Sequence, residues 1–444
     1  MLCLPGIAEM DERRILFEGI DIPDIDRAPT YADHGGFEGL RRAQSMSPLA
    51  LTDAVAATGL RGRGGAWRLV ADRWRQAQAH GETDYLIVDL LESDPGRFRD
   101  RKLAERQPHR LLEGARIAAR AVGAATVYAC IDSALVRARQ SLLQAIEETR
   151  DESVAIHVHP VAGPFPLAAG DSLVVELIES GRAEPRAQDH AYGEAPQLPR
   201  LFDKQAVVHT ASTLGYLPSL LATAGEVFQS ASSSWAPGTQ AFCVSGLVRR
   251  PGLYEVELGD GTVRDLVEGL AGGARTERAI KFVLHAGYGS FPALLEQDLD
   301  RPLDPGLWAD PAAGEVSGSF GGGSVLVADD SVCAVHTAQR IARSFADSSC
   351  GKCLPCREGT NWLAAALGRL EQGEAEASDL DWIIERCATL TPDLSLCGHG
   401  SSAAAGIGAL CGAFADEFAN HLDGGCSVIK DLSMKVPDSI HVRY

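Results

Sequence analysis

Three cysteines at intervals of three residues constrain this chain more than any other feature. Cys350, Cys353 and Cys356 stand in a loop that Gly351 and Pro355 interrupt. A C-x-x-C-x-x-C run can place three thiolates on three irons of a cubane cluster, which then needs a fourth thiolate from elsewhere in the chain. The spacing therefore predicts a [4Fe-4S] cluster held between this loop and a distant cysteine.

Cys397 is the best candidate for the fourth ligand. It lies in the sequence Leu-Cys-Gly-His-Gly (396–400), a loop ahead of a predicted helix. Glycines beside a ligating cysteine let backbone N–H groups approach the sulfur and tune its basicity. Cys387 and Cys411 fall on the apolar stripes of predicted helices, where we expect buried thiols that serve packing.

Two other roles for the cysteine run fit the pattern less well. A structural zinc site would use two separate C-x-x-C pairs or Cys/His pairs, whereas here the three cysteines overlap in one run. A disulfide framework is implausible in a chain of 444 residues with no signal peptide. Lys352 and Arg357 would complement an anionic cluster, although single charges of this kind can also be simply solvated.

The cysteine motifs resemble those of a known family. Cys-Gly-Lys-Cys-Leu-Pro-Cys-Arg-Glu-Gly-Thr (350–360), followed some forty residues later by Leu-Cys-Gly, is similar to the flavin-bearing, NADH-oxidising subunit of respiratory complex I. The same module recurs in NAD-linked hydrogenases and formate dehydrogenases, and the resemblance extends from about Gly35 to Leu422. It implies FMN and NAD(H) as further cofactors. It also implies other redox-complex subunits as partners, among them a ferredoxin-like protein.

Composition and charge exclude several other classes. The chain is 45% hydrophobic and 23% charged, which indicates a globular protein of several domains. A net charge of −19 argues against nucleic acid or an anionic membrane surface as partner. No apolar run approaches the length of a membrane span, and the eleven cysteines without a secretion signal suit a reducing cytoplasm. Any membrane connection would run through a partner.

A glycine-rich loop, Gly-Leu-Arg-Gly-Arg-Gly-Gly-Ala (59–66), is the main candidate for a flavin cradle. Such a loop can close backbone N–H groups on a phosphate, with its arginines as counter-charges, although a tight turn would explain it as well. In the family this loop carries FMN and the nicotinamide. The resemblance thus gives as cofactor-binding candidates Gly62, Gly64, Gly65, Arg73, Glu92 and Asp94.

The residues after this loop depart from the family pattern. Trp67 and Arg68 stand where the family has Gly-Phe, whose aromatic ring lies against the nicotinamide, and we expect them to fill that space. Arg73, before Trp74, replaces a lysine that binds the flavin phosphate in the family. Arginine can still hold a phosphate, in fact bidentately.

Further departures concern the polar residues that meet flavin and NADH in the family. The apolar run 85–88 reads as a buried parallel strand, and ligands gather at the carboxyl ends of such strands. Glu92 and Asp94 keep the acidic character there, while Asp89 and Leu91 replace Asn and Asp. Gly170-Asp171 stands in place of two glutamates, and His209-Thr210 in place of two asparagines. Losses in four segments indicate a dismantled or re-purposed nucleotide site.

The predicted organisation is an α/β flavin-type domain, a β-grasp insert of the soluble-ligand-binding type, and a C-terminal all-α helical bundle with the cluster. The predicted segments are an N-terminal arm that is loosely ordered (1–34), the α/β FMN/NADH-type domain (35–236), the β-grasp insert (237–295), a connecting segment (296–330), the iron–sulfur bundle (331–425) and a tail (426–444). In the tail, an apolar alternation would suit a short strand or a partner contact, and we expect Cys426 to be an ordinary thiol.

We therefore expect an iron–sulfur electron-transfer subunit of an NADH dehydrogenase-like oxidoreductase. Its metal ligands would be Cys350, Cys353, Cys356 and Cys397, and the sequence assigns no catalytic residue. The alternative is a non-catalytic relay or scaffold paralogue that keeps the cluster but does not oxidise NADH. The retained glycine loop favours the first, and the altered nucleotide-contact positions favour the second.

Overall fold

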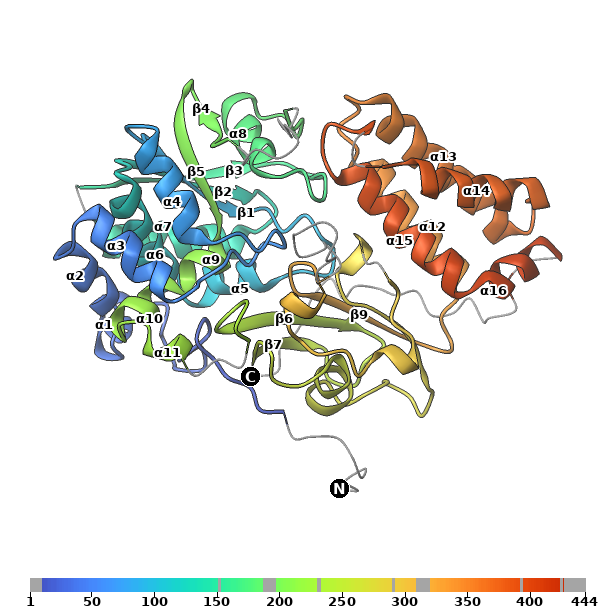
Figure 1. Cartoon of the computed structure of the whole chain (residues 1–444), viewed down its shortest axis with the longest axis horizontal. Helices are drawn as coiled ribbons and strands as arrows, with labels where there is room; N and C mark the ends of the chain where they lie inside the picture. Colours follow the sequence, from blue (N-terminus) through green and yellow to red (C-terminus); the bar gives the residue numbers. More distant parts are fainter. Residues whose placement is uncertain are drawn as a thin grey trace.

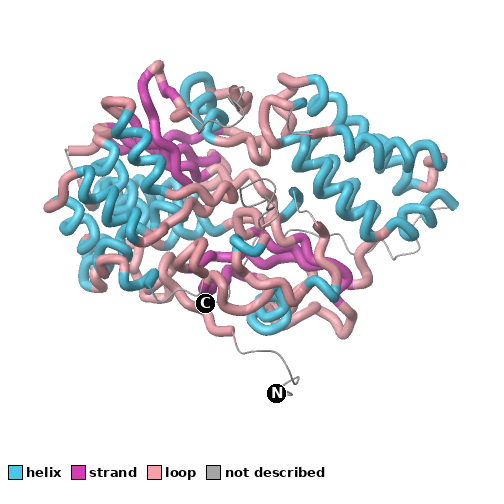
Figure 2. The backbone as a smooth tube through the Cα atoms, in the orientation of Figure 1, coloured by secondary structure: helices cyan, strands magenta, loops and turns pink. Residues whose placement is uncertain are grey.

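A computed structural model describes residues 10–150, 153–186, 197–229, 233–289, 292–308, 320–391, 394–423 and 426. Within this part of the chain, a five-stranded α/β unit and a four-stranded sheet lie side by side, and a group of helices from the C-terminal third lies at their far end (Figure 1). The tube in Figure 2 shows that the strands are confined to the first two parts. No helix among the described residues is long and apolar enough to cross a membrane.

The first sheet has the strand order β3-β2-β1-β5-β4. Its central strands are parallel, with Ile87 of β1 opposite Tyr128 of β2 and Val208 of β5, and only β4 runs antiparallel. The predicted strand at 85–88 is thus confirmed, and its apolar residues are buried because helices cover the sheet. The strands are β1 (Tyr85–Leu90), β2 (Thr126–Asp132), β3 (Ala155–Val161), β4 (Arg200–Leu201) and β5 (Lys204–Thr210).

Helices join and cover these strands. Helix α6 contacts β1 and β2, α7 contacts β3, and α4 contacts β5. The helices of this part are α1 (Ala28–Asp33), α2 (Glu38–Gln44), α3 (Pro48–Ala57), α4 (Val70–Ala79), α5 (Arg99–Arg106), α6 (Pro108–Val122), α7 (Val136–Glu148), α8 (Asp171–Ser180), α9 (Ala211–Gly215), α10 (Leu217–Ala222) and α11 (Glu226–Gln229).

The expectation of a loosely ordered N-terminal arm is wrong for residues 10–34. Ile15, Leu16 and Phe17 are buried in the main hydrophobic core. Their backbone N–H groups donate to the Glu255 carboxylate at 3.0, 2.8 and 2.9 Å. Apolar side chains and a buried acceptor from a distant strand therefore fix a segment whose own sequence carries little helix or strand pattern.

The second sheet has the order β7-β6-β9-β8, with its two central strands parallel. A turn at residues 249–251 joins β6 (Thr239–Gly246) to β7 (Gly252–Glu257). A short π-helix, Asp265–Leu270, follows β7. After β8 (Ile280–Leu284), the chain returns as β9 (Ser324–Asp329) between β6 and β8. The segment predicted as a connection, 296–330, thus supplies a central strand because Val325 and Val327 complete the core.

The C-terminal part is helical, as predicted. It comprises α12 (Ala334–Asp347), α13 (Leu354–Gln372), α14 (Ala377–Thr389), α15 (His399–Ala413) and α16 (Ala415–Asn420). Helix α15 is separated from α16 by Phe414, whose ψ of 37° leaves the helical range. Cys411 is buried and Cys387 half-buried in the core of this part, in agreement with packing roles. Residues 427–444 lie outside the described residues, so the expectation of a short strand or partner contact in the tail remains untested.

Candidate cluster and flavin sites

The structure brings the four predicted cluster cysteines together from two segments. Cys356 and Cys397 are buried, and Cys350 and Cys353 are half-buried. Burial raises the pKa of the Cys356 thiol to about 12 and that of Cys397 to about 11, and the other thiols of the group add to both shifts. Four thiols gathered from two segments form a donor set that suits a cationic iron–sulfur core.

Two helix N-termini point at this thiol group. Cys353 is the N-cap of α13, and Cys397 directly precedes Gly398, the N-cap of α15. The backbone N–H of His399 donates to the Cys397 sulfur. Partial positive charge at the two helix ends favours thiolates there. A Cβ atom at Gly400 would lie 3.2 Å from the Cys356 Cβ, so the close approach of α15 to the cysteine run uses the absence of a side chain.

Sequence reasoning did not single out two neighbours of the thiols. The Ser349 hydroxyl lies 3.5 Å from the Cys356 sulfur and also accepts a 3.4 Å hydrogen bond from the Gly351 N–H. His399 is buried, and its Nε2 is 2.9 Å from the Phe345 carbonyl oxygen, which ties the start of α15 to α12. The proximity of Ser349 to the run was the available signal, whereas the role of His399 depends on the tertiary fold.

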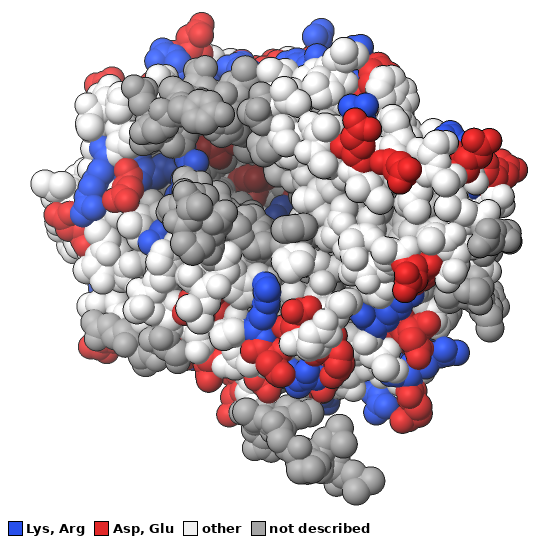
Figure 3. Space-filling model, turned by 45° about the vertical axis from the view of Figure 1, so that its right-hand side comes forward, with Lys and Arg blue, Asp and Glu red and all other residues white. Residues whose placement is uncertain are grey.

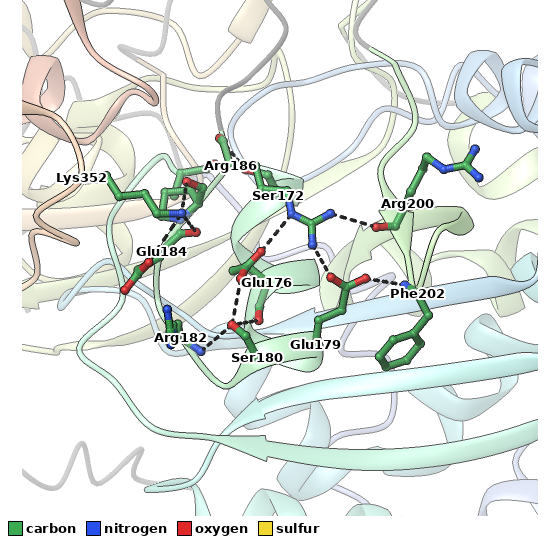
Figure 4. Close-up of polar contacts among 12 residues, drawn as sticks. Ser172, Glu176, Glu179, Ser180, Arg182, Glu184, Arg186, Arg200, Phe202 and Lys352 are labelled. Atoms are coloured by element: carbon green, nitrogen blue, oxygen red, sulfur yellow. Dashed lines mark hydrogen bonds and ion pairs between the residues drawn. The ribbon is translucent and has the colours of Figure 1, made fainter.

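Lys352, inside the cysteine run, anchors the loop to the α/β unit. Its ammonium donates to the Glu184 carbonyl at 3.0 Å and lies 3.6 Å from the Glu184 carboxylate. Beside it, Arg186 is held between Glu176, at 2.9 Å, and Glu179 (Figure 4). Lys352 therefore pairs with the flavin-type domain and is not simply solvated. Arg357 pairs with its neighbour Glu358 at 2.8 Å.

The second cluster segment also contacts the α/β unit directly. The Gly398 N–H donates to the Ala168 carbonyl at 3.2 Å. Cys397 packs in one hydrophobic cluster with Leu91 and Ala169. Leu91 follows β1 and Ala169 precedes α8, so the cluster cysteine adjoins the two segments in which the family's flavin and NADH contacts are expected.

The glycine loop lies against the end of β5 and the chain before β9. A Cβ atom at Gly64 would fall 2.9 Å from the Thr210 methyl carbon, and Gly65 lies beside Gly321 and Gly322. Gly62 donates to the Arg68 carbonyl at 2.8 Å, which closes the loop. Gly64 is exposed, so the loop offers backbone to a ligand on one side while it packs closely on the other.

The two arginines of the loop are not free counter-charges, in contrast to the expectation. Arg63 is buried and donates to the carbonyls of Thr239, Arg61 and Pro237 at 2.9–3.1 Å. Arg61 donates to the Trp235 carbonyl at 2.8 Å and stacks on its ring at 3.7 Å. Both guanidinium groups donate to backbone carbonyls, most of them in the segment 235–239 that leads into the second sheet. The local sequence does not reveal these acceptors.

Trp67 is part of the core of the second sheet, and the expectation that it occupies the nicotinamide space stays a prediction. Only 1% of its surface is exposed, and its ring packs against Phe320 in the core of the second sheet. Its indole N–H donates to the Gly321 carbonyl at 3.1 Å. Arg68 is exposed.

Arg73 is paired with the residue that replaces a family glutamate. Its guanidinium forms an ion pair with Asp171, the first residue of α8. Burial, together with the nearby Arg68, lowers the pKa of Arg73 to about 10, so it remains charged near neutral pH. Its Nε atom is buried and has no hydrogen-bond partner among the described residues. A donor left over in this way fits an anionic ligand group.

His209 is committed to another residue of the fold. Its Nε2 accepts a 3.0 Å hydrogen bond from the Trp74 indole N–H. Burial, and then the charge of Arg73, lowers the pKa of His209 to about 3, so the ring is neutral. The residue that replaces a flavin-contacting asparagine is therefore part of the wall between α4 and β5.

Glu92 and Asp94 lie at the carboxyl end of β1, as predicted. Glu92 accepts the Asp100 N–H at 2.7 Å, and burial together with Asp100 raises the pKa of Glu92 to about 7. Asp94 accepts the Gly96 N–H at 3.2 Å and packs against Gly287. Their carboxylates lie around half-buried Arg97, which the sequence did not single out although it stands inside the acidic segment that follows the strand.

These groups fit a phosphate-bearing flavin at this end of the sheet. Arg97 reaches Gly322 beside Gly64, and its Nε, like that of Arg73, has no hydrogen-bond partner among the described residues. Exposed glycine backbone and two buried guanidiniums with unused donors suit an anionic group next to a planar ring. The face in Figure 3 mixes acidic and basic side chains and is hollowed near its upper centre, where acidic atoms are visible.

The fold and the two adjoining sites define a class of electron-transfer oxidoreductase subunits that join a flavin-binding α/β domain to an iron–sulfur helical region. Two family models match: "Nuo51 FMN-binding domain" over residues 55–217, and "NADH-ubiquinone oxidoreductase-F iron-sulfur binding region" over residues 336–421. The second NADH-quinone oxidoreductase F-subunit of Rhizobium meliloti (strain 1021) is 34% identical over 92% of this chain and 97% of its own length.

Other comparisons agree. The NADH-quinone oxidoreductase F-subunit of Escherichia coli (strain K12) is 29% identical over 88% of this chain and 90% of its own. A chain of an NAD+-reducing [NiFe]-hydrogenase in the H2-reduced state superposes with a TM-score of 0.74 at 26% identity, covering 93% of this chain and 67% of that one. This chain belongs to the family of NADH-quinone oxidoreductase F-subunits.

It follows that the chain is an NADH dehydrogenase-like electron-transfer protein. Its cofactors are a [4Fe-4S] cluster and FMN, and NAD(H) is consistent with the family. The mixed α/β flavin-binding-like fold with a helical C-terminal region is confirmed. Matches over both the FMN-binding and the iron–sulfur regions do not favour the relay or scaffold alternative.

Proposed function

We propose that Cys350, Cys353, Cys356 and Cys397 ligate the cluster, and that FMN lies over the glycine loop with its phosphate near Arg73. The observation that carries this proposal is the direct contact between the two sites. Cys397 packs with Leu91 and Ala169 of the flavin-type domain, and the Gly398 N–H bonds the Ala168 carbonyl. Two redox groups held on these segments would be close neighbours within one chain.

When bound, FMN would supply the link between the two-electron transfer of one hydride from NADH and a cluster that carries one electron at a time. The chain's own residues bind and orient these groups. Gly62, Gly64 and Gly65 present backbone to the flavin, and Arg73 supplies charge for its phosphate. Glu92, whose pKa is near neutrality, and Asp94 offer polar contacts at the strand end. The Lys352–Glu184 pair fixes the cluster loop on the flavin-type domain.

We further propose that the four-stranded sheet is the β-grasp unit predicted from the sequence. The first strand, β6, and the last, β9, lie parallel at the centre of this sheet, and each has an antiparallel partner on its outer side, β7 or β8. This is the strand arrangement expected for a β-grasp fold. Its boundaries would then extend from about 237 to 330 and take in the predicted connection. The flavin-type domain would keep its predicted range, 35–236, and the cluster bundle would run from 331 to 425.

The proposed partners are other subunits of a redox complex. The relatives are subunits of NADH-quinone oxidoreductases, and the structural neighbour is a chain of a hydrogenase. A ferredoxin-like protein would be one of these partners, and a membrane connection would be made through partners, with this chain in the cytoplasm. Neither nucleic acid nor direct membrane insertion is expected, in line with the net charge of −19.

Cofactor content on one anaerobic sample tests the proposed function. The protein is purified without oxygen, non-covalent flavin is released with acid, and iron and acid-labile sulfide are assayed together. We expect about one FMN for about four irons and four sulfides per chain. Iron and sulfide without flavin would overturn the flavin assignment and restore the relay interpretation.

A further inference from the structure

Three metal-ligating side chains converge at a place that neither cofactor uses. The sulfurs of Cys333 and Cys426 and a ring nitrogen of His421 all lie within 4.8 Å of one another. Among the described residues, this is the one group of three or more Cys, His, Asp or Glu ligand atoms so closely spaced. We propose that Cys333, His421 and Cys426 bind a single zinc ion.

The spacing fits one tetrahedral ion. With Zn–S of about 2.3 Å and Zn–N of about 2.05 Å, a tetrahedral angle places sulfur and nitrogen about 3.6 Å apart. The Cys333 sulfur and the His421 Nε2 are 3.4 Å apart. The four cluster cysteines do not form such a convergent group, as expected for ligands that surround a cubane of four irons instead of one ion.

The histidine is already oriented as a ligand. Its Nδ1 lies 2.7 Å from the Glu417 carbonyl and donates its proton there, which leaves the Nε2 lone pair directed at Cys333. Metal-binding histidines are commonly fixed in this way by a hydrogen bond from the other ring nitrogen. Glu417 is itself anchored, because its carboxylate accepts the Ala334 N–H at 2.9 Å and the Lys281 ammonium at 2.5 Å.

Burial and charge at the group also favour a cation. Cys333 and His421 are 7% and 1% exposed, and Cys426 is half-buried. The Glu371 carboxylate of α13 adds negative charge beside Cys333, and its Oε2 is a buried atom with no hydrogen-bond partner among the described residues. Lys281, the cation nearby, is neutralised by Glu417. Binding of Zn²⁺ would release the two thiol protons to solvent, and water would complete the fourth position.

The group is distant from the cluster loop. Cys333 is the N-cap of α12, whose 14 residues extend about 20 Å before the chain reaches Ser348 and the cysteine run. His421 follows α16, at the end of the bundle farther from the five-stranded sheet (Figure 1). Zinc here would link the start of the helical bundle to its last turn. Cys426 would then be a ligand in place of the ordinary thiol that the sequence suggested.

Metal analysis of the whole chain tests the zinc site separately from the cluster. One equivalent of Zn²⁺ is added to anaerobically purified protein, unbound metal is removed, and iron and zinc are then measured on the same sample. We expect about one zinc per chain, and at least a tenfold loss of zinc in H421Q and C426S with iron unchanged. C353S should lose iron and keep zinc. C387S, a half-buried cysteine of the same bundle, is the matched control and should keep both.

Three outcomes would overturn the proposal. The first is a chain that retains no zinc after this treatment although its iron is complete. The second is a disulfide between Cys333 and Cys426, found by mass spectrometry of the unreduced peptide. The third is loss of iron, with zinc unaffected, in H421Q and C426S. Because Cys426 is only half-buried, C426S keeps the test valid if variants of the buried Cys333 fail to fold.

Discussion

The backbone N–H of Gly398 donates to the carbonyl of Ala168 across 3.2 Å and so joins the cluster segment to the flavin-type domain. The two residues are 230 positions apart in the chain. Gly398 follows the proposed ligand Cys397, and Ala168 opens the segment in which the family places its glutamates. Through this contact the proposed cluster site and the proposed flavin site lie next to each other. The predictions below test the two sites separately.

Replacing Cys353 by serine should remove the cluster. A serine hydroxyl is a poor ligand for iron, so the broad visible absorbance and the iron content should fall at least severalfold. Both are measured on anaerobically purified protein, with C387S as the control that keeps them. Unchanged iron in C353S would refute the ligand assignment.

Replacing Gly64 by valine should weaken flavin binding at least tenfold and leave the cluster intact. A Cβ atom there would lie 2.9 Å from the Thr210 methyl carbon, so the loop must move away from its present position. A cost of about 1.4 kcal/mol or more weakens binding about tenfold or more. Acid-released flavin per iron reports the effect. G368A is the control, because a Cβ atom at Gly368 of α13 meets nothing within 4 Å.

Arg73 should contribute to flavin affinity through its charge. Loss of a hydrogen-bonded charge at a phosphate costs about 1.5–3 kcal/mol, so R73Q should bind FMN roughly ten- to a hundredfold more weakly, and R73K less so. D171N releases Arg73 from its ion pair and should bind FMN as well as the parent protein or more tightly. Fluorescence titration of the flavin-free protein measures these affinities. Weaker binding in D171N alone would assign the flavin contact to Asp171 and not to Arg73.

His209 should make stability fall in mild acid. The pKa of His209 in the folded protein is about 3, below the ordinary value of 6.5. Between these two pH values His209 is therefore protonated in the unfolded chain and neutral in the folded one. The free energy of unfolding should therefore drop by about 1.4 kcal/mol per pH unit from this group. H209Q can still accept the Trp74 N–H and should lack this part of the loss.

Urea unfolding at pH 7 and at pH 5.5 measures the difference between the parent protein and H209Q. Other buried histidines with lowered pKa, among them His285 and His399, are present in both proteins and cancel in the comparison. H157Q changes an exposed histidine on β3 and should keep the parent pH dependence. An equal loss of stability in H209Q and the parent would show that His209 is not held neutral.

Much of the fold followed from local patterns. The apolar run at 85–88 predicted a buried parallel strand, and the sequence also predicted that the part after residue 331 is helical. The start of α13 at Leu354, where Cys353 caps the helix and Pro355 suits its first turn, and the break at Phe414 are seen only in the structure. The ordering of residues 10–34 could not be predicted, because it depends on a buried carboxylate on β7, more than two hundred residues away.

The candidate cluster site could be predicted because its ligands follow a characteristic spacing in the sequence. The run 350–356 and Cys397 pointed to a cluster because few other functions use that pattern. The roles of Arg61 and Arg63 were misjudged, since their acceptors are backbone carbonyls that no side-chain pattern reveals. The sequence also did not predict that Cys333, His421 and Cys426 lie close together, because only the packing of the helices brings residue 333 next to residue 421.

The most direct test of the account is electron paramagnetic resonance of the anaerobic protein after addition of NADH. If FMN and the cluster lie next to each other in one chain, NADH should bleach the flavin and generate the signal of a reduced cluster in the parent protein. In G64V the same addition should give no signal, while dithionite should still reduce the cluster. A cluster that dithionite reduces and NADH does not, in parent protein that contains FMN, would contradict the account.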